Sequence, residues 1–228
     1  MVLTPTTLTR AAGLAAVAGG LLFIAVQIKH PQVDAPFTTT TEYAVRETAK
    51  IFMAVLSLIG ITGIYLRQVR QAGVLGLIGY LLLAVGYLTM MSAQVIGLFI
   101  LPDLAASQPG YVNDVLAVAT SDAPIGDVGG FQTLSRVGIA YIAGGVIFGI
   151  ALFRADVLAR WAAVLMSVGA VATVATFQLP ELTQRLFAVP AGVALIGLGF
   201  SLWREQRTAA ALPLPSPPAS QLDPADAR

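Results

Sequence analysis

The side chains best placed to bind a ligand lie near the ends of long apolar segments, and Lys50 is the most informative of them. The uncharged stretch after it, 51–66, has 16 residues. As a helix it would cover only about 24 Å of a hydrocarbon core that is roughly 30 Å thick. Lys50 is therefore expected at, or just below, the membrane surface. Glu47 precedes Lys50 by three residues and Glu42 precedes Arg46 by four, both spacings of helical ion pairs.

Other polar side chains reach the same level if the apolar segments run antiparallel. We hypothesise that they line an outward-facing pocket for a small anionic or zwitterionic group, such as a lipid headgroup. The simpler interpretation is that the cations extend to the interface, Glu47 neutralises one of them, and the glutamines bond to neighbouring helices. The predicted pocket residues are Gln27, His30, Arg46, Glu47, Lys50, Gln94, Arg136 and Gln178.

The composition predicts an all-α, polytopic membrane protein and excludes several kinds of site. Hydrophobic residues make up 57% of the chain and charged residues 11%, with a mean hydropathy of +0.80. The absence of cysteine and the single histidine exclude disulfides, thiolate metal sites and two-histidine metal or haem sites within one chain. The net charge of +1 gives no signal for nucleic acid. We therefore predict no cofactor and no metal.

The distribution of carboxylates also argues against an enzyme. No Asp or Glu lies in the middle of an apolar segment, so the membrane interior offers neither paired carboxylates for acid–base chemistry nor a proton relay. No nucleophile elbow occurs, and GDVGG at Gly126 lacks the spacing of a phosphate loop. The four aspartates between Pro102 and Thr133 lack calcium-ligand spacing and are expected to be solvated. No catalytic residue is predicted.

Six apolar segments predict a bundle of six transmembrane helices, which forms a single domain over 1–207. The basic turn RQVRQ at 67–71 joins the second and third as a hairpin, and the spacing of Thr39 and Glu42 predicts a capping box that opens the second. The third, without a formal charge, is too long for one upright span and is expected to protrude or break near Ser92 to Gly97. The predicted spans are 11–28, 44–66, 72–101, 137–153, 161–179 and 186–203.

Two further segments complete the organisation of the chain. The loop 102–133 is predicted to be extracytoplasmic, with a short helix over VNDVLAVA, and the Pro-rich tail 208–228 is predicted to be disordered and cytoplasmic. An export signal is an alternative for the first apolar run. That run is long, however, and no small-residue cleavage site follows it before Lys29.

The positions of the basic residues predict that both termini are cytoplasmic. Five cations fall on the side that would be outside: Lys29, Arg46, Lys50, Arg136 and Arg185. Seven fall on the side of the N-terminus: Arg10, Arg67, Arg70, Arg154, Arg160, Arg204 and Arg207. This excess satisfies the positive-inside rule. Arginine-rich and alanine-rich composition favours a bacterial source, hence a bacterial cytoplasmic membrane.

Two weak similarities suggest inverted halves of three helices each. AGGLLF at Ala18 matches AGGVIF at Ala143, and AVLS at Ala54 matches AVLMS at Ala163. Because three spans separate the members of each pair, the halves would have opposite orientations, as in many secondary transporters. Small residues spaced by four, such as Gly145 and Gly149, allow close helix contacts within the chain or in a homo-oligomer.

The order of parts resembles a broad group of uncharacterised six-span membrane proteins from high-GC bacteria, of actinobacterial type. The matching stretches are RAAGLAAVAGGLLF near the start, the long loop before the fourth span, and LFRADVLARWAAVLMSVGA over the last short turn. The resemblance covers roughly residues 8 to 205 and brings no chemistry with it. We expect a non-enzymatic binding, assembly or regulatory component of the lipid bilayer, with a small permease as the alternative.

Overall fold

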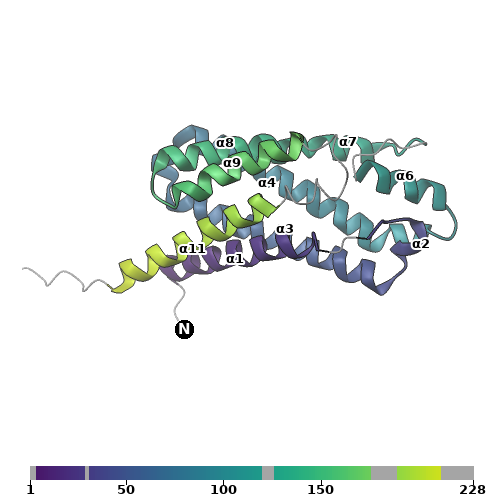
Figure 1. Ribbon diagram of the computed structural model, residues 1–228, viewed down its shortest axis with the longest axis horizontal. Helices are drawn as coiled ribbons and strands as arrows, with labels where there is room; N and C mark the ends of the chain where they lie inside the picture. Colours follow the sequence, from purple (N-terminus) through teal and green to yellow (C-terminus); the bar gives the residue numbers. More distant parts are fainter. Residues whose placement is uncertain (1–3, 29–30, 120–125, 176–188, 212–228) are drawn as a thin grey trace, which may run out of the picture.

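The computed structural model describes residues 4–28, 31–119, 126–175 and 189–211, and within them all regular structure is helical. The helices run nearly parallel to one long axis, with the short helices gathered at one end and both ends of the described chain at the other (Figure 1). The helices are α1 (Pro5–Ala25), α2 (Ala35–Thr38), α3 (Thr41–Arg67), α4 (Val69–Phe99), α5 (Leu101–Leu104), α6 (Pro109–Ala119), α7 (Gly130–Val137), α8 (Ile139–Ala155), α9 (Arg160–Ala175) and α11 (Val189–Ala211).

Four of these helices, counting α7 and α8 as one, are long and apolar enough to cross a membrane: Pro5–Ala25, Thr41–Arg67, Val69–Phe99 and Gly130–Ala155. A shorter apolar helix covers Arg160–Ala172. A helix therefore lies in each of the six predicted segments, although α9 ends at Ala175 in the described part. The tail predicted over 208–228 starts too early, because α11 continues to Ala211, and the rest of it lies outside the described residues. The chain is an all-helical protein with the properties of a membrane-embedded one.

The six long helices form a closed ring in chain order. α1 packs on α3, α3 on α4, α4 on α8, α8 on α9, α9 on α11, and α11 returns to α1. The predicted hairpin of α3 and α4 is confirmed. The first and last long helices of the chain therefore share an interface (Figure 1).

Two helix starts differ from the sequence prediction. α3 is capped by Thr40, whose hydroxyl accepts from the Tyr43 backbone N–H at 3.2 Å, and not by Thr39, which donates to the Pro36 carbonyl. Thr39 is the C-cap of the four-residue helix α2, so the N-cap of α3 falls one position later. α1 begins at Pro5, six residues earlier than predicted, because Thr4 accepts from the Thr7 N–H and proline suits the first turn.

The predicted break in the third long segment is wrong in position. α4 is helical through Ser92 and Gly97, and its non-helical residue is Gly73, with φ 57° and ψ −152°. Glycine is suited to this conformation because it has no Cβ to clash with the backbone. The break follows the turn at Gln68, whose buried side chain donates to the Ile64 carbonyl. From Gly73 onward the helix continues uninterrupted to Phe99.

Glycines bring the backbones of neighbouring helices into contact at two interfaces. Between α1 and α11, a Cβ on Gly20 would lie 2.5 Å from the Gly192 carbonyl, and one on Gly199 would lie 2.5 Å from the Gly13 carbonyl. Those distances are shorter than any normal contact. Between α4 and α8, Gly79, Gly86 and Gly144 meet the facing backbone in the same way.

The small-residue faces predicted from the sequence are used within the chain. Ala12 and Ala16 of α1 meet Gly63 and Gly60 of α3, while Gly145 and Gly149 of α8 meet Ala170 and Ser167 of α9. A homo-oligomer would therefore have to form through other surfaces.

The matched AGG motifs do not occupy equivalent positions in the ring. Gly19 faces the following helix, α3, and Gly20 faces the preceding neighbour in the ring, α11. In the second motif the order is reversed, because Gly144 faces α4 and Gly145 faces α9. Any structural repeat relating the halves would need a register different from the one that the motifs suggest.

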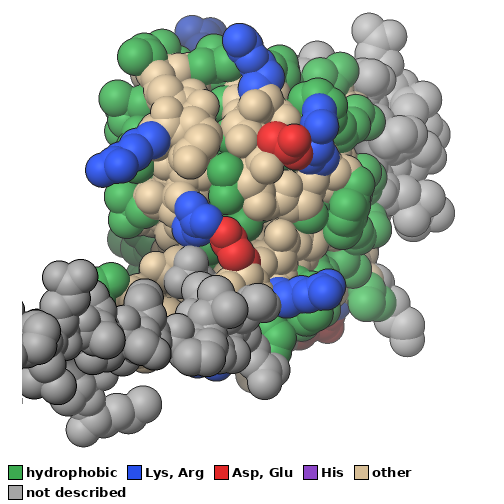
Figure 2. Space-filling model, turned by 90° about the vertical axis from the view of Figure 1, so that its left-hand side faces the viewer, with side chains coloured by type: hydrophobic (Ala, Val, Ile, Leu, Met, Phe, Trp, Pro, Cys, Tyr) green, Lys and Arg blue, Asp and Glu red, His purple; other side chains and the backbone are tan. Residues whose placement is uncertain are grey.

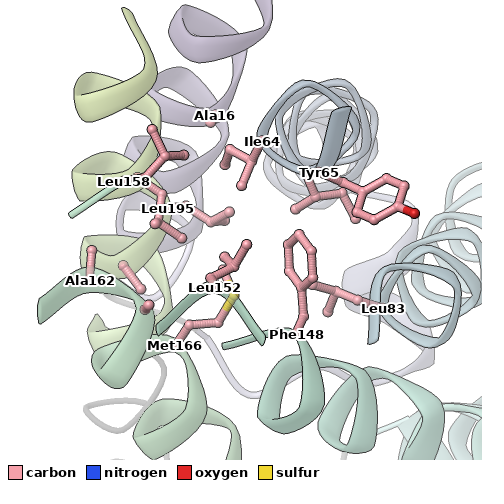
Figure 3. Close-up of a cluster of buried hydrophobic side chains, with 14 of the residues drawn as sticks. Ala16, Ile64, Tyr65, Leu83, Phe148, Leu152, Leu158, Ala162, Met166 and Leu195 are labelled. Atoms are coloured by element: carbon pink, nitrogen blue, oxygen red, sulfur yellow. The ribbon is translucent and has the colours of Figure 1, made fainter. Parts of the chain in front are cut away.

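Large apolar side chains fill the middle of the ring (Figure 3). Phe148 and Leu152 from α8 meet Leu195 from α11 and Met166 from α9, with Ile64 and Tyr65 facing them from α3. A cavity of about 10 Å³ lies beside Tyr87 and Tyr141, with room for about one water molecule.

We call the end that carries the α3–α4 and α8–α9 connections the turn end. Arginines spread over it with acidic side chains between them and a rim of hydrophobic groups (Figure 2). The Arg67 guanidinium of α3 donates to both carboxylate oxygens of Glu205 on α11, with Nε at 3.0 Å from Oε2. Asp156 ends α8 in the left-handed conformation, with φ 53°, and pairs with Arg160.

We call the opposite end, formed by α2, α5, α6 and α7, the loop end. These short helices enclose a second apolar cluster that includes Ala35, Leu101, Val112 and Val128. The Ala35 N–H donates to the Asn113 side-chain carbonyl at 2.8 Å and so joins α2 to α6. The short helix predicted over VNDVLAVA is confirmed as α6.

Candidate functional site

A buried ion pair lies on α3 near the loop end. The Lys50 ammonium is 2.6 Å from Glu47 Oε1, so the predicted pair is confirmed. Glu47 is only 4% exposed, while the Lys50 side chain retains 19%. The two residues lie one helical turn apart, which places both head groups on the same face of α3.

Space for the carboxylate is provided by Gly97 on the neighbouring helix α4. A Cβ at Gly97 would lie 3.4 Å from Glu47 Oε2 and 2.9 Å from the hydroxyl oxygen of Tyr43. Tyr43 precedes Glu47 by one turn on α3 and is 3% exposed. Its ring meets Phe37 of α2 edge-on, with centroids 6.0 Å apart. We call Tyr43, Glu47, Lys50 and Gly97 the Glu47 cluster.

Arg46 belongs to a separate, more exposed pair. Its guanidinium is 2.9 Å from Glu42 Oε1, four residues earlier, and Nη1 lies 3.5 Å from the Ile28 carbonyl after α1. The Glu42 side chain is 57% exposed. Each of these cations has a carboxylate partner on its own helix, so the two pairs together carry no net charge.

The remaining predicted residues are only partly brought together. Gln27 lies in the turn after α1, half-buried, on the segment that Arg46 reaches through Ile28. Gln94 is half-buried on α4, three residues before Gly97. Arg136 is exposed in the last turn of α7. His30 and Gln178 lie outside the described residues. The eight-residue pocket as a whole stays a prediction.

Sequence reasoning missed Tyr43 and Gly97. Tyr43 carried a usable signal, because it lies four residues before Glu47 and therefore on the same face of the helix. Gly97 carried none, since nothing in an apolar run shows which of its residues will face a particular carboxylate.

The Glu47 cluster carries groups that can bind a ligand. It offers one carboxylate, one ammonium and one phenol, and it contains no activated nucleophile. Across the described residues no group of three or more His, Cys, Asp or Glu side chains is placed to hold a metal ion.

Comparison with known proteins gives no further guidance. Neither a family model, nor a curated protein, nor a solved structure matches the chain. The resemblance to six-span bacterial proteins therefore stays a prediction.

Proposed function

We propose that this protein crosses a bacterial cytoplasmic membrane six times, with both termini in the cytoplasm, and binds a small zwitterionic group at its loop end without catalysing a reaction. The closed ring supports the six-span count. α9 and α11 complete the same ring as the four helices that are long and apolar enough to cross a membrane, and the 16 residues of α9 cover about 24 Å.

The proposed orientation rests on the arginines at the turn end. Arg67, Arg70, Arg154 and Arg160 lie in or beside the two short connections there, where the positive-inside rule counts most. Topology reporters fused at Arg67 and at Asp114 test this orientation. We expect a cytoplasmic signal from the first and an extracytoplasmic signal from the second, and the opposite result would reverse the topology.

The single observation that carries the binding proposal is the burial of Glu47. Charged groups within membrane-spanning helices are costly and usually serve function, because the bilayer offers them no water. Glu47 faces the adjacent helix at a glycine, and Lys50 keeps enough exposure to meet a ligand from the surface. Because the pair is neutral, an ammonium and an anionic group on one ligand would each find a partner of opposite charge.

Thermal unfolding of the purified protein tests this proposal. Short-chain zwitterionic and anionic phospholipids, inorganic phosphate and free amino acids are added to the wild type and to Lys50→Met. A ligand at a hundred times its dissociation constant stabilises a protein by about 2.7 kcal/mol. We expect a zwitterionic compound to stabilise the wild type and to lose its effect in Lys50→Met.

Arg160→Met is the matched control, since it removes a cation from an exposed helical pair at the turn end. It should keep the full ligand-induced shift. If no compound shifts the wild type, or if the shift survives Lys50→Met, the Glu47 cluster is structural and the binding proposal fails.

A small permease built from two three-helix halves is the second candidate, and the ring order favours it. α1, α3 and α4 contact one another in the same sequence as α8, α9 and α11, and the two sets meet at α4–α8 and α11–α1. Inverted halves that move against each other would use those two interfaces. Flux of a stabilising compound into vesicles that contain the protein, absent from empty vesicles, would favour the permease over a binding component.

A further inference from the structure

A groove of about 670 Å³ opens at the loop end, between the last turn of α4 and the short helices that follow it. Ile96 of α4 and Ile100, the C-cap of α4, line it, with Leu104 of α5, Tyr111 of α6 and Phe131 of α7. Its volume falls within the range of about 300 to 1,000 Å³ that is usual for sites that enclose small molecules.

This groove is separate from the Glu47 cluster. Ile100, whose N–H donates to the Ile96 carbonyl at the end of α4, lies one turn after Ile96 on the same face, whereas Gly97 lies about 100° around the helix and faces Tyr43 and Glu47 on α3. One helix therefore presents different faces to the two sites.

The groove continues the apolar outer surface of α4. Ile100, a lining residue, is 50% exposed, and its neighbour Phe99 is 62% exposed. In a membrane-embedded helix such side chains meet the hydrocarbon chains of lipids. Because Ile100 belongs both to this surface and to the groove, an acyl chain can extend from one into the other, and most of the lining residues are apolar like the chain itself.

The polar part of the lining selects for positive charge. Asp127 lies on the rim just before α7, and its Oδ1 accepts the Gly129 N–H at 2.8 Å, which holds the carboxylate in place. The sequence from Pro102 to Thr133 contains four aspartates and no Lys, Arg or His. An ammonium group is attracted to this rim, and a headgroup with a net negative charge is repelled.

We propose that the groove binds one acyl chain of a membrane phospholipid whose headgroup ammonium pairs with Asp127. The chain occupies the space between Ile100, Leu104 and Phe131, and the headgroup lies at the start of α7. This proposal goes beyond the binding at the Glu47 cluster and does not depend on it, because the two sites share no side chain.

Native mass spectrometry of the full-length protein tests the proposal with phosphatidylethanolamine and phosphatidylglycerol of identical acyl chains. We expect the wild type to retain at least threefold more phosphatidylethanolamine. Asp127→Asn should abolish this preference while the protein still binds both lipids. Leu104→Trp should reduce retention of both at least threefold, because the indole fills the groove.

Two further variants keep the test decisive. Ile100→Trp blocks the groove from its half-exposed side, so its effect cannot be attributed to a collapsed core. Leu88→Trp places the same ring on the exposed surface of α4 away from the groove and should retain lipid like the wild type. Equal retention of both lipids by the wild type would overturn the headgroup assignment. Unchanged retention in both groove-blocking variants would overturn the site.

Discussion

The two ends of the bundle handle charge in opposite ways. At the turn end, Arg67 pairs with Glu205 across two helices, and both side chains remain about one-third exposed. At the loop end, the Glu47 carboxylate lies almost entirely inside the protein with Lys50 beside it. The first pair joins two helices and remains partly solvated, whereas the second keeps a carboxylate buried, away from water. Of these two pairs, the one at the loop end carries the larger cost of removing charge from water.

Removing the cation at the loop end should give the largest effect on stability. Lys50→Met leaves Glu47 buried without its partner, and breaking a buried pair in this way costs about 3 kcal/mol. Glu47→Gln should cost less, because Lys50 can extend toward the surface. The measurement is the free energy of unfolding in detergent, with circular dichroism as the readout.

The double variant Glu47→Gln/Lys50→Met is the control for this comparison. It removes both charges, so most of the stability lost in Lys50→Met should return. A cost for Lys50→Met no greater than that of Arg67→Ala would mean that the two ends do not differ as described.

Closing the space beside the buried carboxylate should have an intermediate effect. In Gly97→Ala, the new methyl group meets the Tyr43 hydroxyl and Glu47, so the side chains must shift, at a cost of about 1 to 2 kcal/mol. Gly110→Ala is the matched control, since no atom lies within 4 Å of the Cβ position there. The same unfolding measurement applies, and equal effects at both positions would contradict the close fit at Gly97.

The turn-end pair should matter least, and salt should weaken it. Arg67→Ala removes a bidentate but partly exposed pair, so we expect a loss of about 1 kcal/mol that shrinks in 1 M salt. Glu42→Gln, in the exposed pair of α3, should change stability by less than about 0.5 kcal/mol. Unfolding free energies at low and high salt separate these cases, and a loss in Arg67→Ala that does not respond to salt would be inconsistent with a solvated pair.

Local features were readable from the sequence because they depend on residues close together in the chain. The pairing of Glu47 with Lys50 follows from helical spacing, and α6 follows from the pattern of VNDVLAVA. The sequence could not predict which face of each helix packs against which neighbour, because helices with apolar residues on every side have no apolar stripe that marks the buried face. Gly97 opposite Glu47 and the groove beside Ile100 both depend on such facing.

The interface between α1 and α11 has a consequence for how the protein is made. Its contacts join Gly13 to Gly199 and Gly20 to Gly192, so they require the first and last long helices at once. At about 5 to 20 residues per second, a ribosome needs roughly 10 to 40 seconds to synthesise the chain between these partners. Throughout that interval one flank of α1 lacks its partner helix, and the ring can close only after α11 has been synthesised.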